Sequence, residues 1–446
     1  MKCEEIRDEM VAYLKGELSD EAKQEIDEHL ARCQGCRREL EQAQKLLAKT
    51  LSANESSIVD LADSIVQEAV NTSASDIHIN PTRDGADILL RIDGVLKHIK
   101  HLSIQERDAL VTRYKMMGSI PTSECRIPQD GRMLVKLNNI DYDLRISVMP
   151  FLYGEKVVAR ILDRGISLPS LDRMGFLPEQ LDQVRILIKQ PCGALYVSGP
   201  TGTGKTSILY SILQELINPE ISIMTIEDPI EMVLTGVQQA SVDKKEGLTF
   251  ASALRAFFRQ DPDIIMAGEI RDYESLELLI AGAITGHFML STLHTQHAVD
   301  VPQRLLNVGA DPFMVSDSTI GVISSVLARI ICPQCKEEYE PSAEALRWLG
   351  LTDMIGKTKF YHGTGCDACR GVGYKGRIGL HEVLVLNNEM SRMISARQTD
   401  PNMILRCAIE HGFITMIEVA RKRVLEGITT PEELFRLAHL ITSGPV

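Results

Sequence analysis

Apolar and polar residues alternate with a period of two at residues 76–79 and 87–92, and this period is typical of half-buried strands. Asp93-Gly94 stands between the second run and another apolar run, which predicts a hairpin. Helical patterns occupy residues 59–71 and 110–117. Three more strand-like runs follow, centred near Leu134, Leu144 and Val157. The pattern therefore predicts a compact α+β domain.

Beyond residue 165 the pattern changes, because strand-like and helix-like runs take turns as far as residue 331. Such alternation predicts βαβ units and a mainly parallel sheet. The start of the chain looks helical, and the polar run that follows it predicts a linker. We expect six segments: a helical domain at 1–50, a linker at 51–57, the α+β domain at 58–165, the βα core at 166–331, a Gly- and Cys-rich subdomain at 332–383 and a helical region at 384–446.

The bulk composition is that of a globular protein, with 446 residues, 44% of them hydrophobic and 24% charged. The most apolar stretch, residues 276–293, is broken by Glu277 and His287, so we expect no membrane span. The acidic N-terminus lacks the apolar run of a secretory signal, and we expect a cytoplasmic protein. The net charge of −13 argues against non-specific nucleic-acid binding by the whole surface.

One segment of the βα region carries a specific chemical signature. Residues 199–206 fill every position of the phosphate-binding pattern G-x-x-x-x-G-K-S/T, after a strand-like run and before a helical one. In that context backbone N–H groups surround a phosphate chain, Lys205 reaches the β- and γ-phosphates and Thr206 ligates Mg²⁺. A nucleoside triphosphate is therefore the expected ligand. The predicted binding residues are Gly199, Pro200, Thr201, Gly202, Thr203, Gly204, Lys205, Thr206 and Ser207.

Three further runs in this region place polar side chains at the ends of predicted strands. Residues 261–272 end in carboxylates that include Glu269, residues 223–231 include Glu227, and residues 290–295 include His294. A carboxylate at the carboxyl end of a parallel strand can hold Mg²⁺ through water or polarise an attacking water. Taken singly, each run favours the alternative, which is an ordinary buried strand with acidic ends or, for His287, His294 and His297, histidines with a structural role.

Seven of the ten cysteines fall in two clusters, and a cytoplasmic chain is expected to keep them reduced. Two Cys-x-x-Cys pairs, Cys332/Cys335 and Cys366/Cys369, can close a tetrahedral Zn²⁺ site with four thiolates. The alternative is four free, buried thiols.

The second cluster comprises Cys3, His29, Cys33 and Cys36. Because His29 and Cys33 are four residues apart, they share one helix face, and this set also predicts Zn²⁺. A redox-sensing or metal-free helical hairpin remains the alternative.

These motifs occur together and in a fixed order. In this combination the chain resembles the ATPases of type II secretion and type IV pilus systems, a branch of the RecA-like hexameric motors. The resemblance extends from about residue 58 to residue 440, and it rests on the phosphate loop together with residues 225–231, 263–272, 285–295, 74–79, 128–132 and 153–158. It implies an α/β fold with a RecA-like P-loop ATPase core and a parallel-rich sheet, preceded by a small PAS-like α+β domain and an N-terminal helical zinc-binding domain.

The resemblance also implies roles for single residues. Glu269 would orient the attacking water and, with Thr206, hold Mg²⁺. Glu227 would be a second carboxylate near the metal, and His294 would sense the γ-phosphate. Arg132 and Arg145 would approach ATP from the smaller domain, where guanidinium groups stabilise charge on the γ-phosphoryl group. Surface ion pairing is the alternative for both arginines.

The implied protein is an ATP-hydrolysing motor that drives assembly of a pseudopilus or pilus-like filament. Its partners would be copies of itself in a homohexamer, an inner-membrane platform protein and a cytoplasmic adaptor, with no specific nucleic acid and with peripheral attachment to the inner membrane. Within this resemblance, the tetracysteine set favours a motor that assembles filaments over one that retracts them. Three departures from the family pattern, at Ser207, at residues 296–300 and at residues 327–329, leave subunit contacts open.

The first fifty residues resemble the zinc-binding domain of anti-sigma factors. We infer a docking role for them, as a hypothesis. A different class of function follows if this domain is primary: a nucleotide-gated regulatory switch whose zinc domain binds a transcription or signalling partner.

Overall fold

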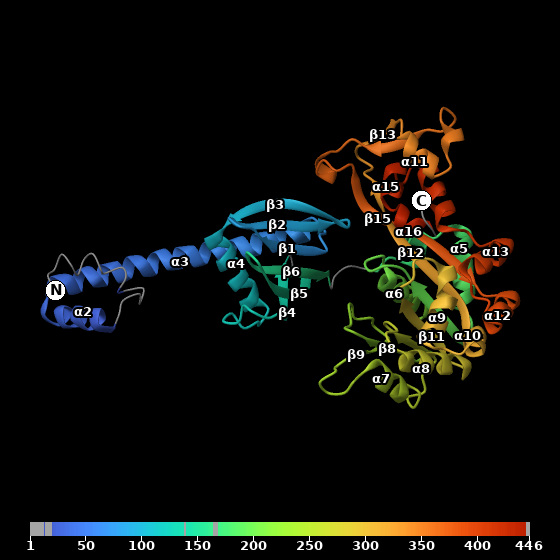
Figure 1. Ribbon diagram of the computed structural model, residues 1–446, viewed down its shortest axis with the longest axis horizontal. Coiled ribbons are helices and arrows are strands. Elements are labelled where there is room, and N and C mark those ends of the chain that lie inside the picture. Colours follow the sequence, from blue (N-terminus) through green and yellow to red (C-terminus); the bar gives the residue numbers. More distant parts are fainter. Residues whose placement is uncertain (1–12, 14–19, 138–139, 164–167, 443–446) are drawn as a thin grey trace. The chain divides into compact units, whose positions relative to one another are not determined.

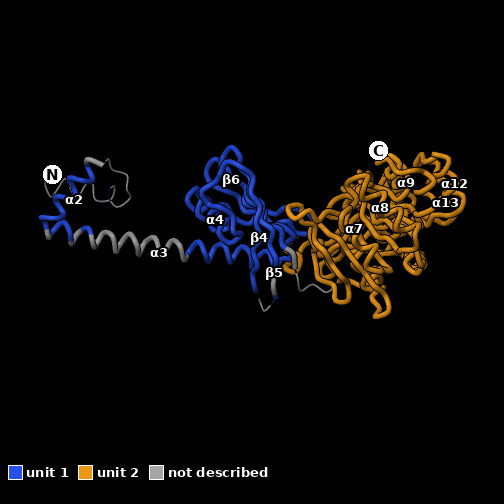
Figure 2. Tube along the Cα trace, turned by 90° about the horizontal axis from the view of Figure 1, so that it is seen from below, with its two compact units in different colours: residues 1–165 blue, residues 166–446 orange. Residues whose placement is uncertain are grey.

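The computed structural model describes residue 13 and residues 20–137, 140–163 and 168–442. The chain forms two compact units, residues 1–165 and residues 166–446 (Figure 2). Each unit has its own sheet and its own hydrophobic core. Figure 1 labels the helices and strands.

Unit 1 begins with two helices, α2 (Asp20–Arg32) and α3 (Gln34–Asn71), separated by the extended backbone of Cys33. The prediction of a linker at residues 51–57 is wrong, because α3 runs through these residues without a break. The segment contains no proline or glycine to end a helix, and the intrinsic helix propensities of Ser, Asn and Glu are only modestly below that of alanine or close to it. Polarity alone was therefore a poor linker signal.

The rest of unit 1 is an antiparallel six-stranded sheet with strand order β3-β2-β1-β6-β5-β4. Its strands are β1 (Asp76–Pro81), β2 (Gly85–Ile92), β3 (Val95–Ser103), β4 (Gln129–Leu137), β5 (Ile140–Phe151) and β6 (Gly154–Asp163). Positive φ angles at Asp93 and Gly94 confirm the predicted hairpin between β2 and β3. α4 (Ile104–Met117) starts at a capping box of Ser103 and Glu106, and it packs with α3 on the sheet.

Unit 2 contains a seven-stranded sheet with strand order β15-β12-β7-β11-β10-β8-β9. Its strands are β7 (Gly193–Ser198), β8 (Ile223–Glu227), β9 (Gln238–Ser241), β10 (Ile264–Ala267), β11 (Phe288–Leu293), β12 (Thr319–Ile331) and β15 (Tyr374–Val385). All neighbours are parallel except β12 and β15, so the predicted parallel-rich sheet is confirmed.

Helices cover both faces of this sheet. Ala194 and Tyr196 of β7 point into one core with α7 and α8, whereas Leu195 and Val197 point into the opposite core with α5 and α6. A strand buried on both faces needs a continuous apolar run, and residues 194–197 supply it. The helices of this part are α5 (Pro178–Leu187), α6 (Lys205–Leu216), α7 (Phe250–Phe257), α8 (Tyr273–Ile284), α9 (Val301–Val308) and α10 (Pro312–Ser318).

The Cys-rich segment carries the short hairpin of β13 (Lys336–Tyr339) and β14 (Phe360–Gly363), with α11 (Ala343–Trp348) between the two strands. The chain then forms α12 (Asn388–Ser395), α13 (Pro401–Glu410), α14 (Met416–Leu425), α15 (Pro431–Arg436) and α16 (Ala438–Ile441), which lie within the helical region expected at residues 384–446. α11 and α15 lie side by side (Figure 1). Among the described residues, no helix combines the length and the apolar character needed to cross a membrane.

Candidate nucleotide site and metal centres

The loop between β7 and α6 has the backbone that phosphate binding requires. Gly199, Gly202 and Gly204 all have positive φ, at 142°, 80° and 87°. A Cβ on Gly199 would lie 2.5 Å from the carbonyl oxygen of Ser325, so only glycine fits there. The loop is also tied to β12, because Ser325 Oγ donates to the carbonyl of Thr203 at 3.0 Å. A loop shaped in this way at a helix N-terminus fits a polyphosphate.

Lys205, the first residue of α6, is folded onto this loop. Its Nζ donates to the carbonyl oxygens of Gly199 at 2.6 Å and Pro200 at 3.1 Å. Burial lowers the pKa of Lys205 to about 8, although the nearby Glu269 charge acts in the opposite direction. Thr206 and Ser207 follow it in the first helical turn, both half-buried. The roles assigned to these side chains stay predictions.

Three predicted site residues meet at the carboxyl ends of β7, β10 and β11. Lys205 Nζ lies 3.4 Å from Nδ1 of His294, and His294 Nε2 lies 3.7 Å from Oε2 of Glu269. The strand register explains this meeting, because β11 pairs in parallel with both β7 and β10, and the loops after the three strands start at the same sheet edge. Residues 205, 269 and 294 therefore form one cluster.

Arg271 belongs to the same cluster, although no role was predicted for it from the sequence. Its guanidinium forms ion pairs with Glu269 and, at 3.2 Å, with Asp228. The sequence did contain a signal for this residue, because Arg271 is a basic residue only two positions after Glu269 in a segment that is otherwise acidic. The arginine thus lies against the Glu269 carboxylate, with its own side chain 52% exposed.

Other carboxylates of the predicted acidic runs have local structural partners. Asp263 accepts from the backbone N–H of Ser222 at 2.7 Å, at the start of β10 and hence at the opposite end of that strand from Glu269. Asp272 caps α8 by accepting from the N–H of Ser275 at 2.8 Å.

Glu227, at the end of β8, is buried and surrounded by donors of the protein itself. One oxygen accepts from the hydroxyl of Tyr210, and the other accepts from Thr225 Oγ1 at 2.7 Å and Gln239 Nε2 at 3.0 Å. Burial and the Glu227 carboxylate raise the pKa of Tyr210. The structure thus ties Glu227 into the core, and its predicted place beside a metal stays a prediction.

Arg132 and Arg145 lie in unit 1, directly opposite each other on β4 and β5. The guanidinium of Arg132 binds Asp143, with Nε 2.7 Å from Oδ1, and this contact raises the pKa of Arg132. Asp143 is buried whereas the Arg132 side chain is 55% exposed. The ion pair was the alternative left open for this arginine, and an approach to ATP stays a prediction.

The four cysteines of the tetracysteine set, Cys332, Cys335, Cys366 and Cys369, come together as a pre-shaped metal site. The Sγ atoms of Cys332 and Cys366 are 3.8 Å apart, those of Cys335 and Cys369 3.7 Å, and those of Cys366 and Cys369 3.8 Å. Four sulfurs at a zinc–sulfur distance of about 2.3 Å in a tetrahedron would be about 3.8 Å apart. Burial works against the thiolate of Cys369, but N–H donors from Cys366 and Gly373 lower its pKa to about 6. The donor set fits Zn²⁺.

The N-terminal cluster is described in part. Ligand atoms of His29, Cys33 and Cys36 lie within 4.8 Å of one another, and Cys36 is buried with Ile26 and Leu30. Cys3 lies outside the described residues. Three ligands of the predicted set therefore converge where α2 meets α3.

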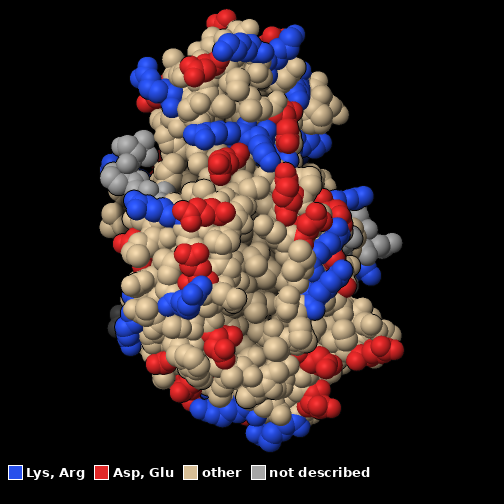
Figure 3. Space-filling view, turned by 90° about the vertical axis from the view of Figure 1, so that its right-hand side faces the viewer, with Lys and Arg blue, Asp and Glu red and all other residues tan. Residues whose placement is uncertain are grey.

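Charge on the exposed face of unit 2 is mixed. On the face shown in Figure 3, basic and acidic side chains are interspersed. The described residues on this face form no continuous basic stripe of the kind that nucleic-acid-binding proteins present.

Comparison with known families matches most of the chain. The family described as "Type II/IV secretion system protein" matches residues 51–436, and the family described as "Putative zinc-finger" matches residues 3–37. The chain is 39% identical over 423 residues to the type IV pilus assembly ATPase PilB of Thermus thermophilus, covering 95% of this chain and 46% of that one. It is 38% identical over 401 residues to the type II secretion system ATPase E of Vibrio cholerae, covering 90% of this chain and 78% of that one.

Two solved structures share the fold. The ATPase DotB of Legionella pneumophila matches with a TM-score of 0.61 and 21% identity, covering 84% of this chain and 95% of DotB. The pilus retraction motor PilT with bound ADP matches with a TM-score of 0.52 and 24% identity, covering 83% of this chain and 98% of PilT. The predicted fold class is confirmed by these matches.

Proposed function

The chain belongs to the Type II/IV secretion system protein family, which includes the secretion and pilus ATPases named above, and from this premise we propose that it is a Mg²⁺-dependent ATPase motor. The motor would power assembly of a type II secretion pseudopilus or a type IV pilus-like filament. It would act as a homohexamer on an inner-membrane platform protein, together with a cytoplasmic adaptor, and attach peripherally to that membrane.

The convergence of Lys205, His294 and Glu269 carries the proposal. On nucleotide binding, Lys205 Nζ would donate to phosphate oxygens in place of the carbonyls of Gly199 and Pro200. These charged hydrogen bonds would offset the free-energy cost of burying the ammonium group. Glu269, directed by Arg271, would orient the attacking water. His294 touches both side chains and would therefore respond to the γ-phosphate. Mg²⁺ would be held by Thr206 and Glu269 and would supply charge neutralisation.

The division into two units supports a mechanical role. Arg132 and Arg145 belong to a different compact unit from Lys205, so a guanidinium that reached the triphosphate would make hydrolysis depend on the arrangement of the units. In this proposal, residues 58–165 and 166–331 are the moving domains. The tetracysteine set at 332–383 holds structural Zn²⁺, and Glu227 supports the metal region from the core.

Steady-state ATP hydrolysis by the purified full chain tests the proposal. Turnover should require Mg²⁺, and Glu269→Gln should lower kcat by about 10²- to 10⁴-fold, the usual contribution of a general base. Glu274→Gln is the matched control, because Glu274 is exposed and pairs with Arg255 outside the cluster. A protein that hydrolyses no ATP with any divalent metal, or a Glu269→Gln variant as active as the control, would contradict the proposal.

The second candidate function is the nucleotide-gated switch. The zinc-finger match at residues 3–37 and the convergence of His29, Cys33 and Cys36 favour it. A switch would bind nucleotide but hydrolyse it negligibly even with its membrane partner present, so the turnover measurement separates the two functions.

A further inference from the structure

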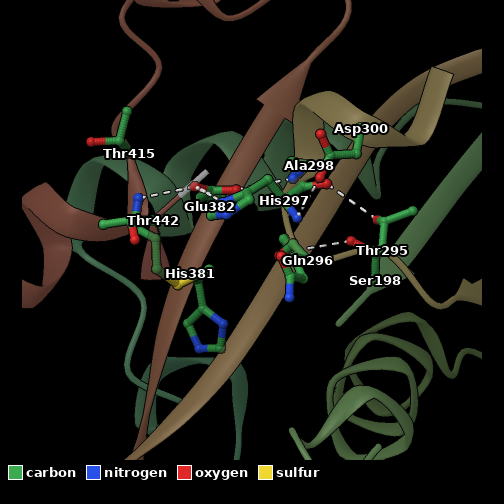
Figure 4. A network of polar contacts seen from close by, with 12 residues as sticks. Ser198, Thr295, Gln296, His297, Ala298, Asp300, His381, Glu382, Thr415 and Thr442 are labelled. Carbon is green, nitrogen blue, oxygen red and sulfur yellow. Dashed lines mark hydrogen bonds and ion pairs between the residues drawn. The ribbon is translucent and has the colours of Figure 1, made fainter. Parts of the chain in front are cut away.

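A buried carboxylate from another part of the sheet holds the loop that follows His294 (Figure 4). Glu382 lies on β15, and its side chain is 4% exposed. Oε1 accepts from Nδ1 of His297 at 3.1 Å and from the N–H of Met416 at 3.0 Å, whereas Oε2 accepts from the N–H of Ala298 at 2.9 Å. One carboxylate thus joins this loop to the first residue of α14.

His297 is as buried as its partner and complements its charge. Burial lowers the pKa of His297, but Glu382 and Asp300 outweigh this effect and raise it overall. Asp300 also accepts from the backbone N–H of His297 at 3.2 Å. A buried carboxylate that loses such a partner is left without compensation in a low-dielectric environment, so the contact resists opening.

The same loop has a second anchor closer to His294, at Gln296. Ser324 Oγ donates to the carbonyl of Gln296 at 2.8 Å, and Ser198 Oγ donates to Ser324 Oγ at 3.0 Å. Ser198 immediately precedes the phosphate loop. Only Thr295 separates the anchored residue Gln296 from His294, so the anchors restrict the backbone next to the histidine, whose side chain is 51% exposed.

We propose that Glu382 is a positioning residue for ATP hydrolysis, which sets where His294 stands between Lys205 and Glu269 by fixing the loop of residues 296–298. The inference rests on the proposed ATPase function. Glu382 makes no contact with Lys205, His294 or Glu269 among its hydrogen bonds in the described structure, so it acts through the loop. The phosphate loop does not depend on these hydrogen bonds, and nucleotide binding should survive their loss.

The test is Glu382→Gln in the full chain, with kcat and KM for ATP measured separately. The amide cannot accept from three donors, and a displacement of His294 by about 1 Å should lower kcat by about 10²-fold while KM stays within about threefold. Glu433→Gln is the matched control: Glu433 is equally buried and binds Arg329 and Arg436, outside the nucleotide cluster. The control should lower the melting temperature and leave kcat unchanged.

A second pair of variants covers the case in which Glu382→Gln does not fold. His297→Asn keeps an N–H donor for the carboxylate and His297→Ala removes it, so kcat should fall for alanine and recover in part for asparagine. Equal kcat in these two variants, or a Glu382→Gln kcat within twofold of the unsubstituted protein, overturns the inference. A chain that hydrolyses no ATP before any substitution overturns the proposed function itself, which distinguishes the two failures.

Discussion

The ammonium nitrogen of Lys205 lies 3.4 Å from Nδ1 of His294, a residue 89 positions further along the chain. Because burial lowers the pKa of Lys205 to about 8, about half of these lysines are neutral at pH 8 before a nucleotide binds. Phosphate oxygens favour the ammonium form. Nucleotide binding should therefore take up about half a proton at pH 8 and about a tenth of one at pH 7.

Calorimetry in two buffers of different ionisation enthalpy measures this uptake. Lys205→Arg is the control, because a guanidinium keeps its charge at every accessible pH. Affinity for MgATP should also decline as the pH rises through 8. Equal binding enthalpies in the two buffers at pH 8 would show that the lysine is already charged, contrary to the prediction.

The tetracysteine set gives a second prediction. Cys369→Ser removes one ligand of four, so the zinc content should fall by about one ion per chain, with a lower melting temperature for unit 2 because structural zinc contributes folding free energy. Metal analysis after dialysis measures the loss. Cys192→Ser changes a half-buried thiol outside both clusters and should keep all the zinc. Undiminished zinc in Cys369→Ser would mean that these thiols are not metal ligands.

Local chemistry made part of this structure predictable. The glycines and Lys205 of the phosphate loop could be assigned because motif, strand and helix lie within 25 residues of sequence, and Asp93-Gly94 specified its hairpin for the same reason. The strand pattern alone does not distinguish the acids of residues 261–272, and only the family resemblance singled out Glu269. The fold separates them: Glu269 reaches the cluster, whereas Asp263 and Asp272 hold backbone N–H groups.

Pairings between distant residues were not predictable. His297 binds Glu382 85 positions away, and no spacing rule connects a loop to a strand at the far end of a sheet. The sequence marked residues 296–300 as a departure from the family pattern, and Glu382 carried no signal of its own. Likewise the sequence predicted Glu227 as a carboxylate at a strand end, and it carried no sign of the contacts with Tyr210 and Gln239 that the fold provides.

Glu433 provides a prediction on stability. Its side chain is fully buried and accepts from Arg329 Nη2 at 2.6 Å and Arg436 Nη2 at 2.7 Å. Burial works against the carboxylate, but these two arginines lower its pKa below 4.5 overall. The folded pKa is depressed, so the contribution to stability is present above pH 4.5 and is lost as the pH falls through the folded value.

Glu433→Gln should therefore cost about 3–5 kcal/mol at pH 7, the usual cost of breaking a buried pair, and less at pH 4. Urea unfolding at the two pH values measures the difference. Glu338→Gln, at an exposed glutamate paired with exposed Lys359, should change little at either pH. A cost for Glu433→Gln that is the same at both pH values would contradict the assigned ionisation.

The N-terminal cluster gives the last prediction, which concerns docking. Ligand atoms of His29, Cys33 and Cys36 already lie within 4.8 Å of one another, so a metal ion would clamp α2 against α3 around the small core of Ile26 and Leu30. Cys33→Ser with Cys36→Ser should release this zinc and abolish co-sedimentation of the full chain with inner-membrane vesicles from its own host. ATP turnover should persist, because the catalytic cluster lies in the other unit.

The control is Cys125→Ser, which changes an exposed thiol of unit 1 outside the N-terminal cluster and should alter neither zinc content nor sedimentation. Unchanged sedimentation after loss of the zinc would refute the docking role, whereas unchanged zinc would refute the metal site itself.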